Sequence, residues 1–177
     1  TAELAPVLED IESAGRIFAS DPDGDSLVYR VKDGAGPLSG TVTFGENGNF
    51  IYRPNENYNG ADAFTIVVTD ALTGTAEFNF NPVIAARNDT PVAQSDLLGI
   101  LQGGSSKVFA SATLLSNDID IDGDQLHVSS VSGAVGGTVS LSENGEIRFT
   151  AKSGYAGSGS CAYTITDSLR GTDHAIA

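Results

Sequence analysis

Hydrophobic and polar residues alternate over short stretches of the chain, which is the period of a β-strand with one buried face. Val42 and Phe44, then Phe50 and Tyr52, alternate with polar or small residues on either side of the sequence GENGN. Asn-Gly between two such runs favours a tight hairpin, because both central residues of the preferred turn have positive φ. We therefore predict a β-hairpin over residues 40–52.

The second half of the chain repeats the first half. Three segments recur in the same order: DPDGDSL (21–27) as DIDGDQL (120–126), GTVTFGENGNFIY (40–52) as GTVSLSENGEIRF (137–149), and FTIVVTD (64–70) as CAYTITD (161–167). Self-similarity on this scale indicates two copies of one folding unit. The predicted boundary lies in AARNDTPVA (85–93), which gives one domain at 1–89 and a second at 90–177.

The pattern predicts an all-β fold in both copies. Six or seven short strands in each copy, separated by turns rich in Gly, Asn and Asp, are typical of a β-sandwich. In ELAPVLEDIES (3–13) the apolar residues have helical spacing, and TLLSN (113–117) has the pattern of a helical turn. We expect both to form short irregular or helical entries to a sandwich. The second copy stops at DHAIA, so we expect its last strand to be truncated and the chain to be a fragment of a longer protein.

The acidic composition narrows the range of partners. Twenty-three acidic residues against nine basic ones give a net charge of −14. This charge argues against binding nucleic acid or an anionic membrane and favours divalent cations, basic partners or salty surroundings. Cys161 is the single cysteine, so no internal disulfide is possible. A secreted domain of this kind needs another source of stability, such as a metal ion.

The most acidic stretch is NDIDIDGDQL (117–126), which contains Asp118, Asp120, Asp122 and Asp124. A helix–loop–helix calcium site needs a glutamate at its twelfth position, and counting from Asp118 that position is Ser129. Two interpretations remain open. The stretch is a solvated β-turn, for which Asp and Gly are favoured locally, or it holds Ca²⁺, which hard carboxylate ligands without Cys or His select.

Several motifs together resemble a known family. LLSNDIDIDGDQLHVSSV (114–131), GTVSLSENGEIRF and GYAGSGSCAYTITDSLRG (154–171) are similar to the cadherin-like tandem repeats of giant bacterial surface adhesins, of the RTX and biofilm type, and of some secreted polysaccharide-degrading proteins. In the first copy, APVLED and IFASDPDGDSL resemble the same family. The resemblance implies two cadherin-like or Ig-like Greek-key β-sandwiches located outside the cell or on the bacterial surface.

The resemblance also implies a calcium site, because cadherins bind Ca²⁺ at domain junctions. Carried over by position, the junction ligands are Glu9 or Asp10, Asp62, Asn88, Asp89, Asp120, Asp122 and Asp167. The remaining acidic residues of the repeated motifs complete the candidate set: Asp21, Asp23, Asp25, Asp70, Asp118 and Asp124. The sequence departs from the family pattern in two places. Gly159 stands opposite Asp62, so a site beyond the second domain would lack that ligand. The segment before the first domain lacks the Asn-Asp pair, so we expect Asp21, Asp23 and Asp70 to have incomplete upstream partners.

The leading functional hypothesis is an extracellular calcium-binding repeat of an adhesin, in which Ca²⁺ stiffens the domain junction. Its partners would be neighbouring repeats, with glycans or surface proteins of another cell as further candidates. The alternative is a carbohydrate-binding module of a polysaccharide-acting protein, which needs a row of exposed aromatic residues. A halophilic adaptation would explain the acidic composition without any binding site.

The sequence offers no catalytic motif. We predict that the chain is not an enzyme, because no Gly-x-Ser-x-Gly elbow or phosphate loop is present. We expect Cys161 to be a buried, inert thiol.

Overall fold

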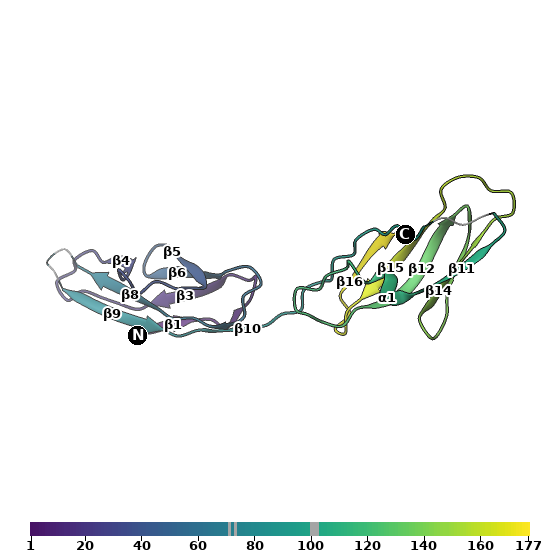
Figure 1. Cartoon of the computed structure of the whole chain (residues 1–177). Helices are drawn as coiled ribbons and strands as arrows, with labels where there is room; N and C mark the ends of the chain where they lie inside the picture. The colour runs from purple at the N-terminus through teal and green to yellow at the C-terminus, as the bar shows by residue number, and fades with distance from the viewer. Residues whose placement is uncertain (71, 73, 100–102) are drawn as a thin grey trace. The chain divides into compact units, whose positions relative to one another are not determined.

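The chain forms two compact units, Thr1–Arg87 and Asn88–Ala177. The structure is a computed structural model that describes residues 1–70, 72, 74–99 and 103–177. Both units are built mainly from antiparallel strands, with two main layers around an apolar core, as Figure 1 shows. This arrangement confirms the predicted all-β fold of two tandem Ig-like β-sandwiches.

The first unit is a sandwich of short strands. They are β1 (Ala2–Leu4), β2 (Val7–Leu8), β3 (Ser13–Ile17), β4 (Val28–Val31), β5 (Gly40–Phe44), β6 (Asn49–Pro54), β7 (Gly60–Ala61), β8 (Phe64–Thr69), β9 (Thr75–Phe80) and β10 (Val83–Ala85). One layer has the strand order β1-β3-β6-β5 and the other β4-β8-β9. A small third sheet, β2-β10-β7, contains the parallel pair β10 and β2 and closes one edge of the unit.

Aromatic residues dominate the core of the first unit. The ring of Phe64 stacks on Phe80 at 5.0 Å and on Tyr52 at 5.3 Å between centroids. Phe50 packs edge-on against Phe64 and Phe80. All four side chains are buried, and Tyr52 is completely inaccessible. Phe50 and Tyr52 are there because β6 buries every second residue, while Phe64 begins β8 and Phe80 ends β9 at buried positions.

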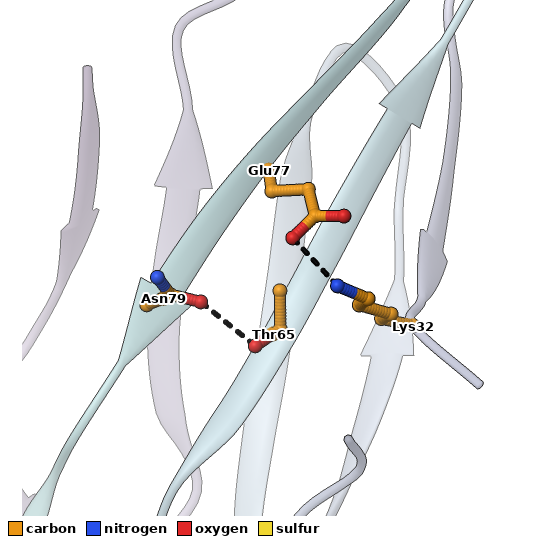
Figure 2. A network of polar contacts seen from close by, with 4 residues as sticks. All are labelled: Lys32, Thr65, Glu77 and Asn79. Carbon is orange, nitrogen blue, oxygen red and sulfur yellow. Dashed lines mark hydrogen bonds and ion pairs between the residues drawn. The ribbon is translucent and has the colours of Figure 1, made fainter. Parts of the chain in front are cut away.

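The outward face of the β4-β8-β9 sheet carries polar cross-strand pairs. Lys32 donates to Glu77 at 2.8 Å, and the hydroxyl of Thr65 donates to Asn79 at 2.8 Å, as Figure 2 shows. Thr65 and Asn79 are directly opposite each other in the register of β8 and β9. Pairs of neighbouring side chains on one face of a sheet stabilise the sheet. This sheet therefore has one apolar and one polar face.

The second unit has the same two-layer organisation. Its elements are β11 (Ser106–Ala110), α1 (Ser111–Leu114), β12 (His127–Val135), β13 (Gly137–Leu141), β14 (Glu146–Ala151), β15 (Ser160–Thr166) and β16 (Thr172–Ile176). The layers have the orders β11-β14-β13 and β12-β15-β16. Its buried core is less aromatic and consists of Leu114, Ile147, Tyr163, Ile165 and Ala175.

The predicted Asn-Gly hairpin forms between β5 and β6, and its counterpart forms between β13 and β14 with a different turn. Asn47 and Gly48 have φ values of 56° and 76°, as the predicted turn requires. In the second copy only Gly145 has a positive φ, of 79°. Its amide donates to the carbonyl of Ser142 at 3.0 Å, which is typical of a type I turn followed by a left-handed glycine. The two copies therefore close equivalent hairpins with different turn types.

Of the two expected irregular or helical entries, the structure corrects the first and confirms the second. The segment 3–13 contains the strands β1 and β2 and no helix, because its residues pair with β3 and β10. The predicted helical turn near residue 113 exists as α1, which begins at Ser111 and ends at Leu114. At the other end of the second unit, β16 aligns with β9, and the described residues contain no counterpart of β10.

Candidate metal centre

The loop at residues 120–124 is folded by its own aspartate. Oδ1 of Asp120 accepts hydrogen bonds from the main-chain nitrogens of Asp122 at 3.0 Å and Asp124 at 3.1 Å. Gly123 between them has φ of 78°, a conformation that side chains rarely adopt. The sequence Asp-x-Asp-Gly-Asp thus encodes a tight turn by local chemistry alone.

The matching loop in the first unit folds in the same way. Oδ1 of Asp21 accepts from the nitrogens of Asp23 at 2.8 Å and Asp25 at 3.2 Å. Gly24 has φ of 84°. The shared turn explains why the motif occurs twice, and it requires no ion. A functional difference between the copies has to come from what surrounds each loop.

In the second unit the loop gathers three carboxylates. One oxygen each from Asp120, Asp122 and Asp124 lies within 4.8 Å of the other two. Within the described ranges, this is the one group of three or more acidic, His or Cys side chains that is close enough to hold a metal ion. Like charges at this separation repel each other unless a cation or protons compensate.

The residues at the start of the second unit join this loop. The main-chain nitrogen of Asp89 donates to Oδ2 of Asp122 at 2.8 Å. The side-chain amide of Asn88 donates to Oδ2 of Asp167 at 2.9 Å. Asp167 itself caps the turn between β15 and β16 by accepting from the nitrogens of Leu169 and Gly171. Three segments that are remote in sequence therefore contribute predicted ligands to one end of this unit.

Hydrogen bonds lower the pKa of the Asp167 carboxyl. The amide of Asn88, together with the main-chain nitrogens of the turn, lowers the pKa of this buried carboxyl below its ordinary value. The same hydrogen bonds extend the pH range in which Asp167 is ionised towards lower pH. Hydrogen bonds to the charged form have this effect because they favour the anion over the acid.

Several oxygens around the loop have no donor. Asn88 Oδ1, Asp120 Oδ2 and Asp124 Oδ2 are inaccessible to solvent and have no hydrogen-bond partner within the described part of the chain. The other oxygen of Asp124 accepts from the hydroxyl of Ser168 at 3.0 Å. Buried oxygens are normally satisfied, and leaving one without a partner costs about 1–3 kcal/mol. Three such atoms beside one acidic loop are what a hard cation would compensate.

Asp118 lies outside the group of three carboxylates and has other hydrogen-bond partners. Its Oδ1 accepts from the nitrogen of Gln94 at 2.8 Å and from the hydroxyl of Tyr163 at 3.3 Å. Burial raises the pKa of Asp118, and the charges of Asp96 and Asp173 add to the effect. The group of three carboxylates does not include it. Nothing in the sequence pattern pointed to Gln94, Asp96 or Asp173, because they lie outside the repeated motifs.

The predicted ligands of the first unit do not form a comparable group. Glu9 is fully buried and accepts from the main-chain nitrogen of Arg87 and from the side-chain amide of Asn59. Asp10 accepts from the nitrogen of Asn57 at 2.9 Å. Asp70 caps its own turn, as Asp167 does in the second unit, by accepting from the nitrogens of two residues that follow it.

Asp62 is held inside the first unit. Its carboxylate accepts from the hydroxyl of Tyr52 at 2.7 Å and from the nitrogens of Leu38, Ser39 and Ala63. Burial raises the pKa of Asp62, but these hydrogen bonds outweigh burial and bring the pKa below its ordinary value. Four donors occupy its oxygens, so Asp62 acts as a structural anchor in this conformation.

The aromatic residues do not form a binding row. The aromatic side chains among the exposed large hydrophobic residues of the described part are Phe18, in the first unit, and Tyr155, in the second. The hydroxyls of Tyr58 and Tyr155 each donate to a carbonyl three residues further on, which gives both tyrosines a local structural role. Cys161 is buried, as expected, and burial raises the pKa of its thiol.

No helix among the described residues is long and apolar enough to cross a membrane. Comparison with curated protein sequences gave no significant match.

Three chains of solved structures are similar to this one and are compared with it by sequence identity, TM-score and the share of each chain that is covered. An endo-fucoidan hydrolase of glycoside hydrolase family 107 is 18% identical with a TM-score of 0.39, covering 97% of this chain and 26% of that one. Titin domains Z1Z2 in complex with telethonin are 12% identical with a TM-score of 0.31, covering 99% and 93%. The Ig1-2 module of the Drosophila receptor tyrosine phosphatase DLAR is 12% identical with a TM-score of 0.27, covering 98% and 94%. The chain thus spans about a quarter of the length of the hydrolase.

The family assignment comes from the sequence itself. A model described as a bacterial Ig domain matches the chain twice, at residues 3–81 and again at 88–177. The two matches follow the two folded units, and together they cover nearly all of the sequence. The chain therefore belongs to the bacterial Ig domain family, of which it contains two tandem copies.

Proposed function

We propose that the chain is a non-catalytic, calcium-binding spacer from an extracellular bacterial protein of the cadherin-like adhesin type. The observation that carries this proposal is the group of three carboxylates at Asp120, Asp122 and Asp124. Beside it, Asn88 and Asp89 are hydrogen-bonded to Asp167 and Asp122. A turn without a ligand would need the local contacts of the loop but not these contacts with the linker.

Ca²⁺ is the cation that suits these atoms best. The available ligands are carboxylate and amide oxygens, and the group contains no thiolate or imidazole. Ca²⁺ binds six to eight oxygens in flexible geometry, whereas Mg²⁺ demands a near-ideal octahedron and zinc favours nitrogen and sulfur. The proposed ligands are Asn88, Asp89, Asp120, Asp122, Asp124 and Asp167. Affinities of about 10⁻⁴ to 10⁻³ M are usual for extracellular modules of this kind.

The proposed role of the ion is mechanical. Arg87 is held by Glu9 of the first unit, and Asp89, two residues later, is held by the 120–124 loop of the second. An ion that binds Asn88 or Asp89 together with the loop would immobilise the segment that joins the units. A tandem array would then be stiff where calcium is plentiful and flexible where it is scarce.

The repeated turn provides a matched pair of variants for the test. Asp120→Asn and Asp21→Asn change the same position in the two copies, and each aspartate accepts two equivalent main-chain hydrogen bonds. Isothermal titration with Ca²⁺, after chelation of the protein, should show binding that Asp120→Asn abolishes and Asp21→Asn retains. Absence of binding in the millimolar range, or equal behaviour of both variants, would overturn the proposal and leave the loops as turns.

A further inference from the structure

A network of hydrogen bonds fastens the first segment of the second unit to the residues that precede the acidic loop. Val92 and Ile119 form an antiparallel bridge, in which the main-chain nitrogen of each donates to the carbonyl of the other, at 2.7 Å and 3.1 Å. Segments 92–96 and 117–119 lie beside each other at this bridge. Neither segment contains any of the proposed calcium ligands, so the network is separate from the ligands themselves.

Side chains extend the bridge from both segments. The main-chain nitrogen of Gln94 donates to Oδ1 of Asp118 at 2.8 Å, and its side-chain amide donates to the carbonyl of Asn117 at 2.6 Å. In return, the side-chain amide of Asn117 donates to the carbonyls of Gln94 at 3.2 Å and Ser95 at 3.3 Å. Each segment supplies donors and acceptors, so more than the main-chain bridge fixes their relative position.

Tyr163 connects this network to the core. Its hydroxyl donates to the carbonyl of Gln94 at 2.6 Å and lies 3.3 Å from Oδ1 of Asp118. The side chain is 1% exposed, and it belongs to the buried core of the second unit together with Ile147 and Ile165. Protein interiors are closely packed, so a buried ring has little freedom to move. The hydroxyl is therefore a fixed point to which both segments are attached.

The network is close along the chain to proposed ligands on both of its sides. Asp118 precedes Asp120 by two residues, and Val92 follows Asp89 by three. Pro91, between Asp89 and Val92, is fully buried, and its ring fixes the backbone φ at that position. Short pieces of chain thus join the network to the acidic loop on one side and to the start of the second unit on the other.

The first unit has the same acidic turn but not this network. Asn117 and Asp118 lie in the insertion ATLLSNDI (112–119), which the first copy lacks, and Ile66 stands at the position of Tyr163. The turn of the acidic motif nevertheless folds in the first unit. Within the described part of that unit, no three carboxylates gather. The unit that has the network is thus the one that has the candidate site.

We propose that Asp118 and Tyr163 are positioning residues of the calcium site. They hold segment 92–96 in place and so keep Asn88 and Asp89 beside the acidic loop before an ion binds. A site that is ordered in advance binds more tightly, because no binding free energy is lost in ordering its ligands. This inference rests on the proposed function for its calcium readout, but the fastening of segment 92–96 can be measured without any metal.

Amide hydrogen exchange of the metal-free full chain tests the fastening. Tyr163→Phe keeps the ring and the net charge and removes the hydroxyl, so the amides of Val92 and Ile119 should exchange about three- to tenfold faster. Tyr155→Phe is the matched control, because the Tyr155 hydroxyl also donates to a main-chain carbonyl, and it should leave both amides unchanged. Unchanged exchange in Tyr163→Phe, or an equal acceleration at all slowly exchanging amides, would overturn the inference.

Two changes at Asp118 separate its hydrogen bond from its charge. Asp118→Asn retains an oxygen that can accept from the nitrogen of Gln94, so the slow exchange of Val92 and Ile119 should persist in the metal-free chain. Asp118→Ala has no such oxygen and should lose this protection. The role of Asp118 is refuted if the two variants exchange at the same rate at these amides.

Isothermal titration with Ca²⁺ tests the consequence for the site. Tyr163→Phe should raise the Kd about three- to tenfold at unchanged stoichiometry, since every ligand is still present, whereas Asp120→Asn should abolish binding. An unchanged Kd together with faster exchange would overturn the positioning role. If the wild-type chain binds no Ca²⁺ in the millimolar range, the proposed function fails and the positioning role with it. The exchange of Val92 and Ile119 still shows in that case whether the network fastens the segment.

Discussion

The main-chain nitrogen of Asp89 donates a hydrogen bond of 2.8 Å to Oδ2 of Asp122. This contact joins the start of the second unit to an acidic loop 33 residues later. The loop in the first unit has the same internal turn, yet the described residues of that unit hold no comparable group of carboxylates. The calcium proposal therefore concerns the second unit specifically, and its consequences differ between two otherwise similar sandwiches.

Calcium should stabilise the second unit and leave the first unchanged. A ligand that binds only the folded state at one hundred times its Kd adds about 2.7 kcal/mol to the free energy of unfolding. Differential scanning calorimetry with and without Ca²⁺ should show one transition move to higher temperature while the other stays. The Asp120→Asn variant is the control in which neither transition moves. A parallel shift of both transitions in the wild-type chain would contradict the assignment to one unit.

Asp62 should make the first unit sensitive to acid. The pKa of its carboxyl is lower in the folded state than in the unfolded state. Its ionised form therefore stabilises the fold above the unfolded pKa of about 3.9, and this contribution is lost as pH falls through the lower folded pKa. Asp62→Asn should cost about 1–3 kcal/mol at pH 7, the scale of hydrogen bonds to a charged group.

Urea denaturation at pH 7 and in strong acid tests the role of Asp62. The difference in unfolding free energy between wild type and Asp62→Asn should shrink in acid, because both chains then carry a neutral side chain at this position. Asp33→Asn, which changes a fully exposed carboxylate, is the control and should leave the unfolding free energy nearly unchanged at both pH values. An Asp62→Asn effect that is independent of pH would show that shape, and not charge, matters at this position.

The matched core positions should differ in their sensitivity to truncation. Phe64→Ala removes a ring that contacts Phe50, Tyr52 and Phe80, and should cost about 3–5 kcal/mol. Cys161→Ala at the equivalent position removes one small buried group, and should cost about 1 kcal/mol. Chemical denaturation of both variants measures the two values. Equal losses would contradict the smaller contribution expected of the Cys161 side chain.

The polar pairs in Figure 2 should contribute little to stability. Lys32 and Glu77 are 44% and 48% exposed, and pairs of this kind contribute between zero and about 1 kcal/mol. A double-mutant cycle with Lys32→Ala and Glu77→Ala should give a coupling energy in that range. The coupling should fall in 1 M salt, where the screening length is about 3 Å. A coupling that is insensitive to salt would indicate a desolvated pair.

Local patterns predicted most of the fold, because they encode strand and turn directly. The alternation around Phe50 and Tyr52 identified the buried face of β6, and the repeat of the motifs identified two copies of one unit. Non-local pairing was harder to predict. The parallel contact of Ile84 with Val7 depends on how the ends of the first unit meet, and no local pattern records that.

In the candidate site, too, the local turn could be predicted from the sequence and the non-local contacts could not. The turn at Asp120 follows from its own sequence. Asn88 and Asp89 are hydrogen-bonded to Asp167 and Asp122, and their role as calcium ligands stays a prediction. The surroundings of Asp118 and Asp62 could not be predicted. Their carboxylates turn towards Tyr163 and Tyr52 respectively, and both tyrosines are core residues that a motif search has no reason to link with an acidic loop.

The most direct test of calcium binding at the second unit is a Ca²⁺ titration of the ¹⁵N-labelled chain, followed amide by amide. The account predicts saturable shifts, with one common Kd, at Asn88, Asp89 and Gly171 and throughout the 120–124 loop. The amides of the 21–25 loop should remain unchanged. Absence of saturable shifts in the millimolar range, or equal weak shifts in both loops, would contradict the account.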